Sequence, residues 1–236
     1  MGQVNTQGID LAESFFKAHP SIFCLTGAGC SLASGIPTYR RTNGDWQGRQ
    51  PINHADFLSK FSTRQRYWAR SFLGWPTIIQ AEPNPAHSAI TWLHHRKHLS
   101  TVLTQNVDNL HEKSGLTRVQ HLHGDLSFVS CMDCGTRISR DDLQNELSAL
   151  NPNLSIQPQP YRPRPDGDTE VPEAFVRAFK IPSCQSCGGD LKPQVVFFGD
   201  RVPPDLVSNA FEALEAADAL LVIGSSLKIF SGYRFC

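Results

Sequence analysis

Residues 21–29 read SIFCLTGAG, and this stretch indicates the fold. Residues 21–26 form a short apolar run with the character of a buried strand, and the run leads directly into the turn Gly27-Ala28-Gly29. A strand that meets a glycine-rich turn is typical of the first unit of a nucleotide-binding α/β fold, because such a turn can bring backbone N–H groups up to a pyrophosphate. The turn lacks the third glycine of the G-x-G-x-x-G pattern, so other features must support it.

Four further stretches have the character of buried strands, and helical patterns lie between them. The strand candidates are residues 101–104, 119–122, 195–198 and 219–223, and the helical patterns are residues 9–19, 56–73 and 204–217. Strands that alternate with helices predict an α/β fold with a mostly parallel sheet covered on both faces.

Residues 126–193 interrupt this alternation, and we expect an insert with its own stabiliser there. Two C-x-x-C pairs lie in it, at Cys131 and Cys134 and at Cys184 and Cys187. Two residues between thiolates let one turn point both sulfurs at the same ion, and two such turns complete a tetrahedral Zn²⁺ site. A redox role is the alternative for a single C-x-x-C pair. Because all four positions are Cys, the predicted zinc ion is structural.

The composition excludes several classes of protein. The chain has 236 residues, 40% of them hydrophobic, so it can bury a core. Lys plus Arg and Asp plus Glu both number 22, which gives no bulk electrostatic reason to bind nucleic acid or an anionic membrane. No apolar run approaches the roughly 18 residues of a membrane span, and no signal or transit peptide is visible. We expect a cytoplasmic protein with reduced thiols, or a mitochondrial one in a eukaryote.

Polar side chains follow several of the predicted strands. Asn106 and Asp108 follow the second strand, His121 and His123 follow the third, and residues 224–226 (Gly-Ser-Ser) end the last. Ligands bind at this edge of open parallel sheets. Alternatively, the Asn and Asp form a turn and cap the next helix, and a His is a buried structural residue. The two-residue spacing predicts that the two histidines share one wall of a pocket.

Together and in this order, the motifs resemble those of the sirtuin family, over about residues 12–236. They are G-A-G-x-S-x-x-S-G-I-P-x-Y-R at 27–40, T-Q-N-V-D-x-L-H at 104–111, H-x-H-G at 121–124, the paired C-x-x-C, K-P-x-V-V-F-F-G-D at 192–200 and I-G-S-S-L at 223–227. The text between the motifs looks most like the class II sirtuins, which are the mitochondrial type and its bacterial relatives.

The resemblance implies a Rossmann-like NAD-binding domain (a DHS-like NAD/FAD-binding fold) with an inserted small zinc-ribbon domain. The Rossmann-like domain would comprise residues 1–125 and 194–236, and the zinc-binding domain residues 126–193. Members of the family continue with a helix, a strand and an Asn-bearing loop, so we expect this chain to be truncated at its C-terminus.

The implied activity is NAD-dependent protein lysine deacylation of the deacetylase type. The acyl oxygen attacks the ribose C1′, nicotinamide leaves, and the acyl group passes to ADP-ribose. The catalytic residues would be His123, as base on a ribose hydroxyl, with Asn106 and Asp108. NAD would be a co-substrate and one zinc ion structural. We expect a monomer that binds an acyl-lysine protein or peptide, with no direct nucleic acid and no membrane as partner.

The resemblance also assigns binding residues. Those along NAD would be Gly27, Ala28, Gly29, Pro37, Tyr39, Arg40, Gln105, Asn106, Asp108, Gly224, Ser225 and Ser226. Val196 and Phe198 alternate along a predicted strand and would line an apolar acyl tunnel, with core packing as the alternative. Tyr67 and Arg70 have the spacing of a pair that binds acidic acyl groups in one sirtuin class, with ordinary helix packing as the alternative.

Four other functions remain open. The same site could transfer ADP-ribose to protein or act as a lipoamidase. A truncated chain could be a non-catalytic remnant that binds NAD or a peptide. A zinc-ribbon module for nucleic acid is the weakest alternative, because no aromatic and basic surface stands out in the sequence.

Overall fold

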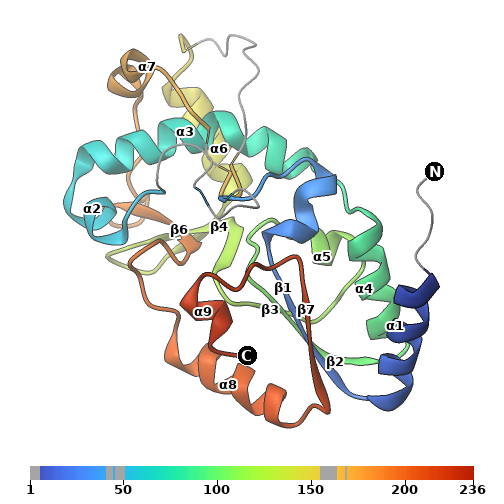
Figure 1. The fold of residues 1–236 in the computed structure, drawn as a ribbon. Coiled ribbons are helices and arrows are strands. Elements are labelled where there is room, and N and C mark those ends of the chain that lie inside the picture. The colour runs from blue at the N-terminus through green and yellow to red at the C-terminus, as the bar shows by residue number, and fades with distance from the viewer. Residues whose placement is uncertain (1–5, 41–44, 46–50, 155–163, 168) are drawn as a thin grey trace.

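A computed structural model describes residues 6–40, 45, 51–154, 164–167 and 169–236 (Figure 1). Its larger sheet has four strands, all parallel, in the order β3-β2-β1-β7. They are β1 Ile22–Thr26, β2 Leu99–Thr104, β3 Val119–His121 and β7 Ala219–Ile223. The predicted parallel α/β sheet is therefore confirmed, and the apolar run at residues 21–26 contains one of its two central strands, β1.

The residues of β1 alternate between two apolar clusters, one on each face of the sheet. Ile22 and Cys24 pack toward helices α1 (Thr6–Ala18) and α4 (Pro85–His95), whereas Phe23 and Leu25 pack toward α8 (Pro204–Glu215). All four side chains are fully buried. A strand covered on both faces has no polar face, which explains why residues 21–26 read as an unbroken apolar run.

The smaller sheet is antiparallel, in the order β5-β4-β6. Its strands are β4 Gly124–Cys131, β5 Arg137–Ser139 and β6 Leu191–Val195. The expected strand of the main sheet at residues 195–198 is therefore wrong. The strand lies four residues earlier and pairs with β4, and Phe198 beyond it makes only an isolated bridge to Asn53. Residues 191–198 alternate between buried and half-buried side chains, and this pattern does not tell which sheet the strand joins.

The remaining helices connect and cover these sheets. They are the 3₁₀ helix Ala28–Ser34, α2 His54–Ser59, α3 Phe61–Gln80, α5 Leu110–Lys113, α6 Arg140–Leu150, α7 Glu173–Ala178 and α9 Phe230–Tyr233. The helix expected at residues 56–73 is two helices, because Lys60 takes an extended conformation between α2 and α3. No helix in the described part of the chain is both long and apolar enough to cross a membrane.

The small sheet shares its core with helices from the N-terminal part of the chain. Phe57 of α2 and Trp68 of α3 belong to the same buried cluster as Leu143 of α6 and Leu191 of β6. The long helix α3 lies across the top of this layer in Figure 1. This shared core contains side chains from both predicted domains. The division of the chain into one domain of residues 1–125 and 194–236 and another of residues 126–193 therefore stays a prediction.

Two buried histidines pack together on the α4 and α5 side of the main sheet. The rings of His87 and His111 lie 5.0 Å apart, and Nε2 of His111 lies 2.9 Å from Thr26 Oγ1. Burial, together with the neighbouring His87, lowers the pKa of His111 to about 4. Burial also lowers the pKa of His87. Both imidazoles are therefore neutral in the folded chain at neutral pH.

This pair predicts that the folded chain loses stability as the pH falls. An unfolded histidine binds a proton near pH 6.5, whereas His111 does so only near pH 4, so the unfolded state gains protons first. The free energy of unfolding should fall between pH 6.5 and 4, with roughly 3 kcal/mol of that loss due to His111. His111→Gln should flatten the dependence, measured by urea unfolding at several pH values. The exposed His95→Gln is the matched control, and an unchanged slope in His111→Gln would contradict the explanation.

Candidate functional site

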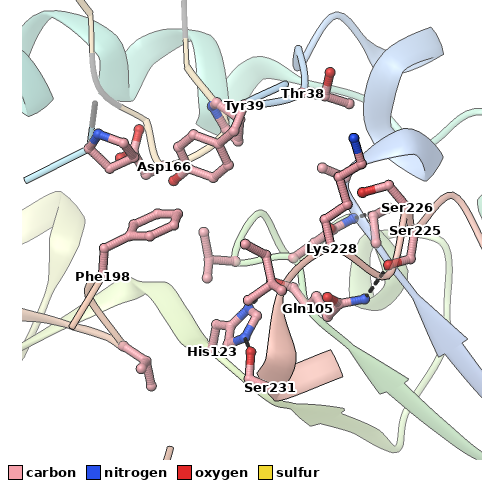
Figure 2. A pocket seen from close by; sticks show the side chains of 18 of the residues that line it. Thr38, Tyr39, Gln105, His123, Asp166, Phe198, Ser225, Ser226, Lys228 and Ser231 are labelled. Carbon is pink, nitrogen blue, oxygen red and sulfur yellow. Dashed lines mark hydrogen bonds between the residues drawn. The ribbon is translucent and has the colours of Figure 1, made fainter. Parts of the chain in front are cut away.

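A cavity of about 910 Å³ opens where strands β1, β2 and β7 end (Figure 2). Its volume is within the range of roughly 300–1,000 Å³ that small-molecule sites occupy. Most of the residues singled out in the sequence line this cavity. They are Gly27, Ala28, Gly29, Tyr39, Arg40, Gln105, Asn106, Asp108, His123, Val196, Phe198, Gly224, Ser225 and Ser226. Segments up to 199 residues apart in the chain thus contribute to one wall.

The glycine-rich turn packs tightly against the end of β7. The backbone N–H of Gly27 donates to Ile223 O over 3.0 Å, and that of Gly29 to Gly224 O over 2.7 Å. A Cβ atom on Gly29 would lie 2.7 Å from Gly224 O, so no larger residue fits without movement. Both glycine N–H groups are therefore engaged in joining the two strand ends, which differs from the expectation that they would face a pyrophosphate.

A buried polar network connects Asn106, Asp108 and Ser31. Ser31 Oγ donates to Asp108 Oδ2 over 2.6 Å, and Asn106 Nδ2 lies 3.1 Å from Ser31 Oγ and 3.2 Å from Gly27 O. Asp108 Oδ1 also accepts from Leu110 N, so the capping role considered as an alternative is present as well. Ser31 is a cavity residue that the sequence analysis did not single out, although its place in the first motif could have signalled it.

His123 is held at both ring nitrogens. Nδ1 lies 2.9 Å from the carbonyl oxygen of Gln105, and Nε2 lies 2.8 Å from Ser231 Oγ (Figure 2). A carbonyl can only accept, so Nδ1 carries the proton and Nε2 is the basic nitrogen. Burial lowers the pKa of His123, the Gln105 carbonyl opposes this, and the charge of Arg234 lowers the pKa further. The imidazole is therefore a neutral base at neutral pH.

His121 does not share this wall, so that prediction was wrong. Strand β3 ends at His121, and its ring pairs with Glu112 of α5, away from the cavity lining. The Leu122 N–H still donates to Thr104 O, and the chain turns at Leu122 and His123. The two-residue period holds only within a strand, and the strand does not reach His123.

The apolar side of the cavity comes from the segment after β6. All four residues from Val195 to Phe198 line the cavity. Val196 and Phe198 are half-buried, whereas Val195 and Phe197 are buried and belong to the apolar core. The ring of Phe198 meets that of Tyr39, with 5.5 Å between their centroids. The alternation expected for these residues is thus present, although only Val195 belongs to a strand.

The structure leaves Pro37, Tyr67 and Arg70 out of the cavity lining. Tyr67 is buried against the rings of Phe57, Trp68 and Phe197. Arg70 Nε donates to the backbone oxygen of Thr169 over 2.9 Å. These contacts are of the kind expected from helix packing, and a role of Tyr67 and Arg70 in acyl recognition stays a prediction.

The four cysteines of the insert form one cluster. All four sulfurs lie within 4.8 Å of one another, with 3.4 Å between Cys131 and Cys187 and 3.7 Å between Cys134 and Cys184. Zn–S bonds of about 2.3 Å in a tetrahedron place sulfurs at about this separation. The residues therefore fit a structural zinc ion that ties the turn after β4 to the loop before β6.

The fold combines a parallel sheet, a cavity at the carboxyl edge of that sheet, and a second, small sheet whose ends carry four clustered cysteines. These features define a Rossmann-like protein with an insert that fits a zinc ion. The chain belongs to the Sir2 family, the sirtuins, because the model of that family ("Sir2 family") matches residues 27–231. The expected family is thereby confirmed.

Relatives in this family are similar over most of the chain. One is the "NAD-dependent protein deacetylase 2" of Bradyrhizobium diazoefficiens, 46% identical over 94% of this chain and 81% of the relative. The human "NAD-dependent protein lipoamidase sirtuin-4, mitochondrial" is 45% identical over 94% of this chain and 71% of its own length. A solved structure described as "Structural Basis for the Mechanism and Regulation of Sir2 Enzymes" is 28% identical, with a TM-score of 0.70 over 96% of this chain and 79% of that one.

The cysteine cluster predicts that zinc stabilises the fold. Cys187→Ser should lose the bound zinc, measured by elemental analysis, and should lower the melting temperature by roughly 10 °C, since metal binding contributes folding free energy. The control is Cys236→Ser, because Cys236 is exposed and lies outside the cluster. Full zinc content in Cys187→Ser would contradict the assignment.

The position of Arg234 predicts a change in the pKa of His123. Arg234→Gln removes a positive charge that disfavours the imidazolium, so the pKa of His123 should rise. Titration of the ring by NMR measures this directly. Arg201→Gln is the control, since Arg201 also lines the cavity without contributing to the pKa of His123. A pKa of His123 that stays the same or falls in Arg234→Gln would show that Arg234 does not act on it.

Proposed function

We propose that this chain is an NAD-dependent protein lysine deacylase that transfers the acyl group to ADP-ribose and releases nicotinamide. The observation that carries the proposal is that the basic Nε2 of His123 and the carboxylate of Asp108 line the same cavity. The bacterial and mitochondrial relatives named NAD-dependent deacetylases, deacylases and lipoamidases support it.

The polar network suits the nicotinamide end of NAD. NAD supplies a ribose C1′ from which nicotinamide can depart, leaving positive charge on the ribose. The Asp108 carboxylate is held by Ser31 and by the backbone of α5, so it is oriented before that charge develops. A fixed carboxylate in a buried site stabilises such charge better than one that must reorient. Asn106 offers an amide beside it, and we assign both residues to this step.

His123 suits the second step, acyl transfer. Its neutral ring can accept a proton from a ribose hydroxyl at Nε2, while Nδ1 stays bonded to Gln105 O. The deprotonated oxygen then attacks the acyl carbon. Val196 and Phe198 provide an apolar wall for the acyl-lysine side chain, and Gly224, Ser225 and Ser226 line the part of the cavity that we assign to the adenosine ribose.

Removal of a bulky acyl group such as lipoyl is a second candidate, favoured by the human and bovine relatives named lipoamidases. It uses the same chemistry, and the length of the acyl chain is the only difference. Because Tyr67 and Arg70 lie outside the cavity lining, the geometry does not favour an acidic acyl group.

The test is mass spectrometry of the products formed from NAD and acetyl-lysine or lipoyl-lysine peptides. The wild type should yield acyl-ADP-ribose. His123→Ala should lower the rate at least about 100-fold, because a general base contributes roughly that much or more. His121→Gln is the matched control, since His121 faces Glu112 outside the cavity, and it should keep most of the activity. ADP-ribosylated protein would instead indicate transfer to protein, and no NAD consumption would indicate a non-catalytic remnant.

A further inference from the structure

The hydrogen bond between Ser231 and His123 brings the end of the described chain into the site. Ser231 lies on α9, which follows β7, and its hydroxyl lies 2.8 Å from Nε2 of His123 (Figure 2). Nε2 is the nitrogen without a proton, so the Ser231 hydroxyl donates to it. The one basic lone pair of the ring thus has a partner inside the cavity lining.

Close packing fixes α9 against Gln105, the residue that holds the other ring nitrogen. Gly232 is buried, and a Cβ atom there would lie 2.5 Å from Gln105 Oε1. Gln105 Nε2 in turn donates to Ser225 Oγ over 2.9 Å. Gly232 and the side chain of Gln105 therefore pack together beside both partners of the His123 ring.

An aromatic contact anchors the far end of α9. Phe235 is buried on the α8 face of the main sheet, with its ring centroid 4.8 Å from that of Phe211 and 6.2 Å from that of Phe23. The helix that carries Ser231 is therefore tied to both β1 and α8. Arg234 on the same segment is the charged group that acts on His123.

We propose that Ser231 is a positioning residue for His123, which keeps the imidazole in the orientation in which Nε2 faces the cavity, while the Gln105 carbonyl sets the tautomer. A hydroxyl suits this role in both protonation states, because it donates to the neutral nitrogen and can rotate to accept from the imidazolium. Nε2 has a single lone pair, so the Ser231 hydroxyl releases it when the ribose hydroxyl donates there. The proton then passes from the ribose hydroxyl to Nε2, and Ser231 keeps its own proton and accepts from the imidazolium. The inference rests on the proposed deacylation.

Measuring two reaction rates distinguishes a role of Ser231 in positioning the base from a role in stabilising the fold. Exchange of labelled nicotinamide into NAD, with an acyl-peptide present, reports the step before the base acts. Formation of acyl-ADP-ribose reports the step that needs the base. Ser231→Ala should lower product formation about tenfold, the effect of one lost hydrogen bond of ordinary strength, and leave exchange within about twofold.

Ser231→Thr is the matched control, because it keeps the hydroxyl, and it should recover most of the product formation. Equal loss of both rates in Ser231→Ala would show a purely structural role. Unchanged or faster product formation would show that the Ser231 hydroxyl does not assist the base. Either result would overturn the inference.

Nitrogen NMR of the His123 ring tests the same inference without turnover. The wild type should show one tautomer with Nδ1 protonated, and with the Nε2 resonance shifted by the hydrogen bond from Ser231. Ser231→Ala should move the Nε2 resonance toward that of an imidazole nitrogen without a hydrogen-bond donor. A wild type that neither exchanges nicotinamide nor forms product would end the proposed function, and the ring spectra would still decide whether Ser231 holds His123. An Nε2 resonance that is unchanged in Ser231→Ala would overturn the positioning role.

Discussion

The close contact between the turns that end β1 and β7 is the constraint on which the site depends. Gly29 donates to Gly224 O over 2.7 Å, and neither residue leaves room for a side chain at that point. Because β1 also pairs with β2, this contact fixes three strand ends relative to one another. The cavity lies where these strand ends meet, so the sheet determines where the polar residues of the cavity lie.

Hydrogen bonds extend this constraint across the cavity. Ser31, just after the glycine-rich turn, holds Asp108 at the end of β2, and Gln105 at the same strand end holds Ser225 after β7. The Gln105 carbonyl then orients His123, which Ser231 holds from the other side. A base and a carboxylate are thus fixed in a partly buried site before any ligand arrives, which is the arrangement that electrostatic catalysis requires.

Much of this organisation could be predicted from the sequence. Continuous apolar runs identified β1 and β7 because both faces of the sheet are covered. The paired C-x-x-C motifs identified the cysteine cluster, because two residues between cysteines are what lets both thiolates bind one zinc ion. Polar residues after each strand identified the cavity because parallel strands end at one edge.

Other features depend on contacts that local patterns do not encode. The strand Leu191–Val195 belongs to the small sheet because it pairs with β4. Its alternation of buried and half-buried residues would be the same in either sheet, so the sequence pattern does not identify the partner. The ring of His121, the last residue of β3, pairs with Glu112. Tyr67 is part of the core because aromatic rings from α2 and from the segment after β6 surround it. Ser231 reaches His123 only through the packing of α9, 108 residues further along the chain.

The most direct measurement of the central claim is a crystal structure of the chain with NAD and an acyl-lysine peptide. The account predicts the nicotinamide end beside Asn106 and Asp108, a ribose hydroxyl within hydrogen-bonding distance of His123 Nε2, and the acyl chain against Val196 and Phe198. A ribose placed away from His123, or a peptide bound outside this cavity, would contradict it.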